Sequence, residues 1–361
     1  MSSASLESLE GIDSFNIVVN QPTLSDDGPK SKKPWKYLSK FEVTCQGYSK
    51  VRCPVYANGR QQIPIQINVE ARDEDGVIVD VNHGRLYLNL CLYDEVDVFP
   101  PELGRSGAED SRFVYNHTVV NALATPEDNE GLPVPLEGTK HWQVVKQFVS
   151  AKKVGTYKLA VRCRSPDWVL FVTNTPNPPA GKFDSWLLVD AREPVAISWT
   201  KVKKTRIDAV NVSYIDVDLY YLYFDCPNLR VVATSHSPGY PANTSHYRWK
   251  NGGKMYDQIC YGAAGGSRLI NWRACHGSTC QFRVYDRPGQ ATVARITTSS
   301  ASSCSNYRQY GVYLGLIDQY GNESRVGIRP IYSGNEITLV DPNTRDLYLD
   351  AEGELVDPGS E

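Results

Sequence analysis

The segment QQIPIQINVEARDEDGVIVDV, residues 61–81, carries the clearest structural signal in the chain. Its first half alternates apolar and polar residues, which is the period of a strand with one buried face. The apolar positions of that face are Ile63, Ile65, Ile67, Val69 and Ala71. An acidic run then leads into Gly76, and the alternation resumes at Val77 and continues through Val79 and Val81. The segment therefore predicts a β-hairpin with one face in the protein core.

The same two-residue period continues on both sides of this hairpin. It is present in FEVTCQGYSKVRCPVY at 41–56, in RLYLNLCLYD at 85–94 and in VGTYKLAVRC at 154–163. A second series of similar segments runs from Val210 to residue 332. We find no amphipathic helix of more than about three turns. Many short strands separated by turn signals predict an all-β chain built from antiparallel sandwiches.

Length and charge restrict the class of protein. A chain of 361 residues can form two or three domains, each with a sizeable core. Its 38 Lys and Arg residues are balanced by 41 Asp and Glu residues, so we expect neither nucleic acid nor an anionic membrane as partner. The longest apolar runs are too short to span a bilayer. The N-terminus lacks the features of a signal peptide, which predicts assembly inside the cell or export by a route that needs none.

Two parts of the chain resemble known bacterial domains. Residues Val55–Val79, VYANGRQQIPIQINVEARDEDGVIV, resemble the opening strands of the bacterial immunoglobulin-like domains of invasin-type proteins, and VGTYKLAV is similar to a late strand of such domains. The segment YGVYLGLIDQYGNES, residues 310–324, resembles the last hairpin of bacterial immunoglobulin-like or fibronectin type III domains. The resemblance implies a bacterial or phage origin and a surface, virion or host-directed setting.

Composition and resemblance together predict four parts along the chain. The first is a flexible tail in which Lys30, Lys32, Lys33, Lys36 and Lys40 repel one another. The expected boundaries are a tail at 1–40, an immunoglobulin-like sandwich at 41–200 with a long insertion near 99–139, a second β-sandwich at 201–340 and an acidic tail at 341–361.

The acidic turn in YGVYLGLIDQYGNES could hold a calcium ion or could simply join two strands. Gly321 and Asn322 tolerate positive φ, and the Asp318 side chain can accept hydrogen bonds from its own turn. A calcium site needs several converging oxygen ligands, whereas Asp318 and Glu323 supply only two locally. We therefore predict a structural hairpin turn.

The densest group of reactive side chains is Cys275, His276 and Cys280, in a chain with nine cysteines. A zinc site lacks the short Cys-x-x-Cys spacing and a fourth ligand nearby. A nucleophilic cysteine beside a histidine in sequence does not by itself have catalytic geometry. The interpretation we favour is a hairpin whose loop, residues 276–279, places Cys275 opposite Cys280 as a pair of thiols or a disulfide.

Other acidic residues and motifs give no stronger indication of chemistry. Asp216 and Asp218 lie two apart on an expected strand, so they share a face, which we interpret as solvated. Neither a nucleotide-binding fingerprint nor a nucleophile elbow is present, and the histidines are scattered. The sequence therefore predicts a protein that is not an enzyme and uses no cofactor or metal.

The segment SHSPGYPANTSHYRWKNGGKMYDQICYGAAGGSR, residues 235–268, differs from the rest in its Tyr, Trp, Asn, Ser and Gly content, and we expect an aromatic, Gly-rich loop. These residue types form antibody paratopes, and aromatic rings beside polar groups also suit sugars. The alternative is an ordered loop whose rings pack back on the sandwich. The candidate ligand-binding residues are Tyr240, Tyr247, Trp249, Asn251, Tyr256 and Tyr261.

Taken together, these observations predict a non-enzymatic recognition or assembly protein. Its partner would be a protein or a carbohydrate, bound through loops at the ends of β-sandwiches that serve as scaffold. One alternative is a host-directed toxin component that forms pores or binds a receptor. A third possibility is an enzyme that uses the Cys275 and His276 cluster. No feature of the sequence indicates a particular oligomeric state.

Overall fold

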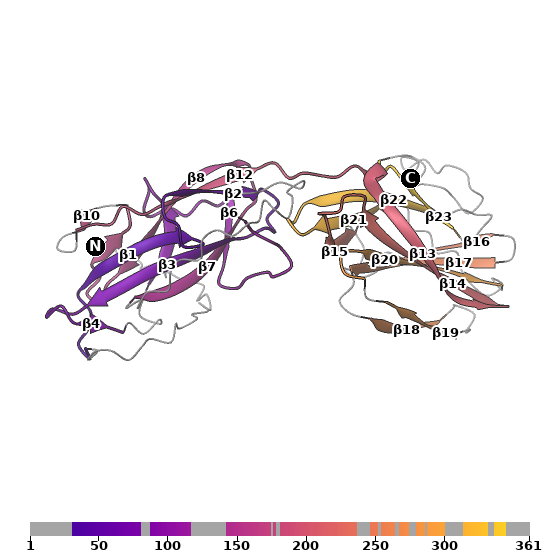
Figure 1. Ribbon diagram of the computed structural model, residues 1–361, viewed down its shortest axis with the longest axis horizontal. Helices are drawn as coiled ribbons and strands as arrows, with labels where there is room; N and C mark the ends of the chain where they lie inside the picture. The colour runs from indigo at the N-terminus through magenta and orange to yellow at the C-terminus, as the bar shows by residue number, and fades with distance from the viewer. Residues whose placement is uncertain are drawn as a thin grey trace, which may run out of the picture. The chain divides into compact units, whose positions relative to one another are not determined.

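The computed structural model describes two compact units (Figure 1). Unit 1 ends at Arg192, and unit 2 begins at Glu193 and also includes the segment from Ser111 to residue 116. The described residues are 31–80, 87–116, 142–174, 176–177, 181–236, 246–251, 254–263, 267–273, 279–285, 287–299, 313–330 and 336–343. Across them, strands dominate and the only helical element is the short 3-10 helix η3, Trp199–Lys201. The predicted all-β fold of antiparallel sandwiches is confirmed.

Unit 1 consists of two main sheets. The first has the order β1-β3-β7-β6, with β4 paired to β3, and the second has the order β2-β12-β8-β5, with β9 paired to β8. All pairs are antiparallel except β2 with β12. The bounds are β1 Tyr37–Cys45, β2 Val51–Tyr56, β3 Ile63–Arg72, β4 Ile78–Val79, β5 Asn89–Leu92, β6 Leu103–Ser106, β7 Gln143–Ala151, β8 Gly155–Arg164, β9 Leu170–Val172 and β12 Leu187–Arg192, beside the small pair β10 Pro176–Asn177 and β11 Gly181–Lys182.

The core of unit 1 follows the alternation read from the sequence. All five predicted apolar positions of β3, from Ile63 to Ala71, are buried, and Leu159 and Val161 of β8 are buried in the second sheet. Ring contacts join segments far apart in sequence, since Trp35 packs on Phe171 and Phe41 meets Phe183 edge to face. Burying alternate residues of both sheets is what holds a two-layer sandwich together.

The end of the expected N-terminal tail is part of the sandwich. β1 begins at Tyr37, and the Trp35 side chain just before it is only 3% exposed. The lysines that were expected to repel one another are separated by partners: Lys33 pairs with Glu74 and Asp75, and Lys36 pairs with Asp167. The expected flexible tail therefore does not extend to residue 40: residues 35–40 belong to the sandwich, and acidic turns supply countercharges to lysines that remain exposed.

Unit 2 has three layers. A five-stranded sheet, β13-β14-β20-β17-β16, lies between the hairpin β18-β19 on one face and the four-stranded sheet β15-β21-β22-β23 on the other (Figure 1). The bounds are β13 Val202–Val212, β14 Ile215–Phe224, β15 Val231–His236, β16 His246–Asn251, β17 Lys254–Ala263, β18 Arg268–Arg273, β19 Thr279–Val284, β20 Ala291–Thr298, β21 Tyr313–Asp318, β22 Glu323–Pro330 and β23 Ile337–Val340.

The central strands of unit 2 are covered on both sides. Val217, Leu219 and Tyr221 of β14 pack against the hairpin through Trp272 and Phe282. Arg295 of β20 points to the opposite side, where it donates to the carbonyl oxygen of Glu336 next to β23. Strands buried on two faces lose the simple alternation of buried and exposed residues, and every residue of β20 is buried.

Two expectations about loops are changed by the structure. The expected insertion at 99–139 contains a strand, β6, whose residues pair with β7, and residues 117–139 lie outside the described part. The expected loop at 235–268 contains β16 and β17, which pair with each other and join the five-stranded sheet through β20. Alternation of aromatic and basic residues in HYRWK, residues 246–250, was the strand signal that the Gly-rich surroundings concealed.

Candidate functional site

One end of unit 1 carries two tight turns, and the first is the turn at 73–77. The Asp73 side chain accepts hydrogen bonds from the amides of Asp75 at 3.0 Å and Val77 at 2.9 Å. Its backbone closes the turn through the amide of Gly76, which has φ +80°. This is a three-residue hairpin loop with a left-handed residue in its last position. Hydrogen bonds from the Ser31 side chain and from the turn amides lower the pKa of Asp73.

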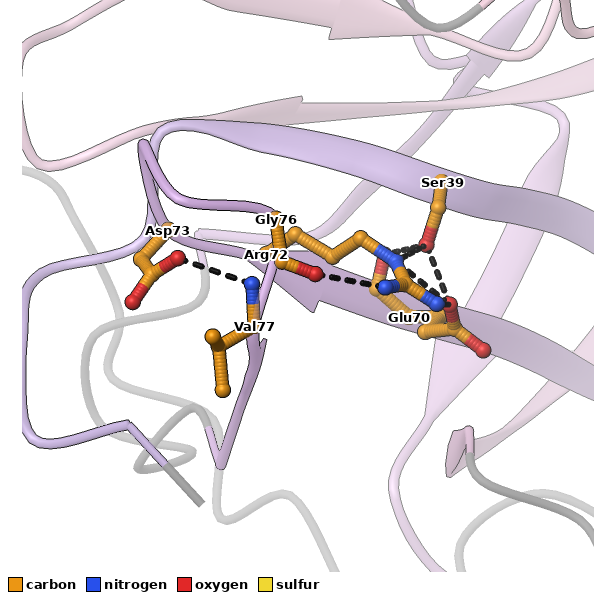
Figure 2. A network of polar contacts seen from close by, with 6 residues as sticks. All are labelled: Ser39, Glu70, Arg72, Asp73, Gly76 and Val77. Atoms are coloured by element: carbon orange, nitrogen blue, oxygen red, sulfur yellow. Dashed lines mark hydrogen bonds and ion pairs between the residues drawn. The ribbon is translucent and has the colours of Figure 1, made fainter. Parts of the chain in front are cut away.

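A polar network fixes this turn to the sheet (Figure 2). Arg72 donates to the carbonyl oxygen of Gly76 at 2.6 Å, and its other nitrogens reach Glu70 and the Ser39 hydroxyl. Ser39 lies at the bulge of β1, where the register shifts between Leu38 and Lys40. Because one guanidinium joins two strands and the turn, the turn is held in place before any ligand arrives.

The second turn, residues 165–169, has the same backbone pattern but different side chains. The Ser165 hydroxyl replaces the aspartate and accepts from the amide of Val169 at 3.0 Å. The amide of Trp168 donates to the carbonyl oxygen of Ser165 at 2.9 Å. Trp168 therefore occupies the left-handed position that glycine occupies in the first turn, with φ +65°. For a residue with a side chain, this conformation costs about 1 kcal/mol or more.

Trp168 is also exposed to an unusual degree for an aromatic residue. Its exposed fraction is 70%, and that of Tyr87 is 61%. The two rings are nearly parallel, with planes 17° apart and centroids separated by 6.3 Å. We call Tyr87 and Trp168 the aromatic pair. A strained backbone that presents a large apolar ring to solvent is a feature typical of binding sites.

Charged groups of both signs border the aromatic pair. The Lys36 ammonium lies 2.5 Å from an Asp167 oxygen, and Arg164 donates to the carbonyl oxygen of Trp168. The pKa of Lys36 is raised by the hydrogen bond to Asp167 and also by the charge of Glu74 in the first turn. Lys36 joins the two turns, since its amide donates to the carbonyl oxygen of Arg72 at 2.8 Å and its ammonium pairs with Asp167, and together with the aromatic pair the turns form the candidate functional site.

A second arrangement with chemical potential is a group of three acids in unit 2. Carboxylate oxygens of Asp208, Asp216 and Asp218 lie within 4.8 Å of one another. Arg206 donates to Asp218 at 2.7 Å, and Asn211 donates to Asp208 at 3.2 Å. The acids could offer three oxygens to a cation, fewer than the six to eight that calcium takes, and the Arg206 guanidinium already supplies positive charge.

Asp218 corrects the expectation of a solvated acidic face. Its side chain is 1% exposed because β14 is covered on both sides. Burial raises its pKa to about 6, the charges of Asp216 and Asp208 act in the same direction, and Arg206 opposes the shift. The two-residue period correctly placed Asp216 and Asp218 on one face of the strand. That face, however, is covered by another sheet of unit 2.

Cys280 carries a free thiol, as do Cys53, Cys91, Cys163 and Cys226, and the residue opposite Cys280 is not the one predicted. Strand pairing places Trp272, not Cys275, opposite Cys280. Trp272 and Phe282 are the hairpin residues whose side chains are buried in the core, and their packing fixes the register. Cys275 and His276 lie outside the described residues. Burial raises the pKa of Cys280 to about 11, which keeps this thiol protonated and a poor nucleophile near neutral pH.

The candidate ligand residues at 235–268 fall on two strands. Backbone register pairs Tyr247 with Gln258, Trp249 with Tyr256 and Asn251 with Lys254, while Tyr261 belongs to β17. Their side chains and the whole of Tyr240 lie outside the described residues. A role for these residues in binding stays a prediction.

Sequence reasoning missed the aromatic pair. Ser165, Pro166 and Asp167 are readable as a turn, and Trp168 follows them directly. The available signal was an aromatic residue at a turn position where glycine or asparagine is usual. What the sequence could not indicate is that Tyr87, far away along the chain, lies beside it.

Comparisons with known proteins add little to this description. Neither a protein-family model nor a curated protein matches the sequence. A solved structure of the Yersinia pseudotuberculosis adhesin InvE is similar at 11% identity and a TM-score of 0.18, covering 83% of this chain and 57% of that one. The chain thus spans little more than half of that structure's length, and a TM-score this low leaves function to be inferred from the residues themselves. The resemblance to invasin-type domains stays a prediction.

Proposed function

We propose that this protein is a non-enzymatic recognition protein and that the candidate functional site at the end of unit 1 contacts its partner. The observation that carries the proposal is Trp168, 70% exposed and held at φ +65° in a turn whose counterparts have glycine. The strained backbone costs stability and the exposed ring gains none from burial, so such a residue is explained best by a contact made outside the chain.

The fixed geometry of the turns also supports a binding role. The surrounding turns are fixed by Arg72 and by the pair of Lys36 with Asp167, so little conformational entropy is lost when a partner binds. Among the described residues, no helix is both long enough and apolar enough to cross a membrane. Loops that display binding residues on a rigid sandwich are a common arrangement in recognition domains.

The test is adherence of the fluorescently labelled full chain to intact cells of several types, measured by flow cytometry. Trp168→Gly introduces the residue found in the equivalent turns and should lower cell binding about tenfold or more while thermal unfolding stays nearly unchanged. A matched control is Tyr285→Ala, which removes an aromatic ring of unit 2 that is 47% exposed. Equal binding by the wild type and Trp168→Gly would contradict the proposed function.

A further inference from the structure

The geometry points to an uncharged carbohydrate ring as the ligand of the aromatic pair, an inference that rests on the proposed function and gives its partner a chemical class. Tyr87 and Trp168 present nearly parallel rings, 17° apart, to solvent. Flat aromatic faces match the apolar C–H face of a sugar ring, and polar groups at their edge can bond its hydroxyls. A protein side chain, in contrast, is usually received in a pocket that excludes water.

The charges of the two turns favour an uncharged ligand. Among the described residues, the two turns and the groups that contact them carry the cations Lys33, Lys36 and Arg164 and the anions Glu74, Asp75 and Asp167. Lys33 and Lys36 each form an ion pair with one or more of these acids, so the local field is close to neutral. Nucleic acids, sulfated glycans and anionic lipids require an excess of positive charge, and the described side chains of the two turns do not provide one.

The same ion pairs supply the hydrogen-bonding groups that a sugar needs. Asp167, the residue before Trp168, offers carboxylate oxygens as acceptors, and N–H donors come from Lys36, which pairs with Asp167, and from Arg164, which donates to the carbonyl oxygen of Trp168. The Asp167 carboxylate is 56% exposed and the Lys36 side chain 44%, so both remain accessible while they are paired. A sugar hydroxyl can donate one hydrogen bond and accept another, so it can bond both the Asp167 carboxylate and a neighbouring N–H donor.

Strain at Trp168 gives this inference its most informative variants. Trp168→Gly removes the ring and relieves the left-handed backbone, so loss of binding will not result from misfolding. Trp168→Phe keeps a flat ring at the same position and should retain part of the affinity. Tyr87→Ala should weaken binding less than Trp168→Gly, because one ring of the pair is left in place.

The experiment measures binding of the full chain to an immobilised panel of neutral, sialylated and sulfated oligosaccharides, to phosphatidylcholine and phosphatidylserine vesicles, and to cells treated with periodate, which destroys sugar rings. We expect binding to neutral oligosaccharides, about tenfold or more weaker with Trp168→Gly, and loss of cell binding after periodate. Preference for sulfated glycans or phosphatidylserine would overturn the inference.

The remaining outcomes separate this inference from the proposed function. Cell binding that requires Trp168 but survives periodate would overturn a carbohydrate ligand and leave a recognition function through a protein partner. Binding to cells and to sugars that is unaffected by Trp168→Gly would overturn both. Binding to neutral sugars that depends on Trp168 would support both.

Discussion

The turns at 73–77 in unit 1 and 318–322 in unit 2 have the same hydrogen bonds and opposite surroundings. In each, an aspartate accepts from the amides two and four residues later, and the following glycine has φ of +80° or +81°. Both aspartates are 1% exposed, but the tips of the turns differ: Glu74 and Asp75 of the first are more than half exposed, whereas Gln319 and Asn322 of the second are buried.

The difference lies in what covers each turn. The side-chain oxygen of Gln319 accepts a hydrogen bond from the amide of Arg230, and its backbone oxygen accepts one from the amide of Val114. Two other segments of unit 2 therefore cover this turn. The first turn is bordered by the Ser31 side chain, which hydrogen-bonds to Asp73, by the Lys33 ammonium and by its own strand neighbours, and its tip stays open. The same local chemistry therefore serves as a structural anchor in unit 2 and as an accessible surface in unit 1.

The largest expected effect is at Asp318. Replacing it with alanine leaves the amides of Tyr320 and Asn322 without their acceptor in a buried turn, which should destabilise unit 2 by about 3 kcal/mol. Urea denaturation with hydrogen exchange detected by mass spectrometry will show which unit unfolds early. Asp318→Asn keeps an acceptor oxygen and is the control. Loss of less than about 1 kcal/mol in the alanine variant would show that water satisfies the turn.

Next comes a pH effect at another buried acid of unit 2, Asp218. Its folded pKa of about 6 lies above the ordinary value of 3.8, so the folded chain holds this proton more tightly than the unfolded chain does. Stability should therefore fall as the pH rises from about 4 to about 6, by on the order of 2–3 kcal/mol from this group.

Asp218→Asn should remove this part of the pH dependence. Urea denaturation at several pH values from 4 to 7 gives the free energy of unfolding, and the difference between the wild type and Asp218→Asn isolates the group. Asp208→Asn, at an exposed member of the same acidic group, should keep most of the slope. Identical pH profiles for the wild type and Asp218→Asn would contradict the burial of this carboxylate.

A smaller loss is expected at Asp73, the counterpart of Asp318. Asp73 is itself only 1% exposed, but the residues whose amides donate to it are exposed, Val77 at 37% and the Asp75 side chain at 60%, so we expect water to replace the acceptor lost in Asp73→Ala. The loss of stability should be clearly smaller than for Asp318→Ala, and hydrogen exchange should accelerate only near residues 73–79. Equal destabilisation by the two variants would mean that the exposed tip of the first turn gives water no access to these amides.

The smallest effect on stability is expected for Trp168→Gly. Glycine relieves the strain of the left-handed backbone, which stabilises the folded state. It also increases the conformational freedom of the unfolded chain, which lowers the free energy of unfolding. Because the two effects oppose each other, the net change should stay below about 1 kcal/mol. Thermal unfolding measures it, with Gly76→Ala as the reverse substitution at the equivalent position. A large loss of stability in Trp168→Gly would assign Trp168 a structural role and weaken its role in binding.

Prediction from sequence was good where a rule is local. The buried face of β3 and the turn formed by Asp318, Gly321 and Asn322 follow from alternation and turn chemistry, and both are confirmed. The segment HYRWK showed strand alternation, but its Gly-rich flanks favoured a loop, and tertiary pairing with β17 decided the matter. Cys280 faces Trp272 because the register follows the packing of the hairpin.

The sequence by itself determined the strand period, the positions of the turns and the all-β class, since each depends on residues that are neighbours along the chain. Only the tertiary structure decided that Asp218 is buried, that Lys33 and Lys36 meet acidic turns, and that Tyr87 lies beside Trp168. These contacts join residues distant in sequence, and their burial depends on which layers cover them. The candidate site is made of such contacts, so its position became visible only in three dimensions.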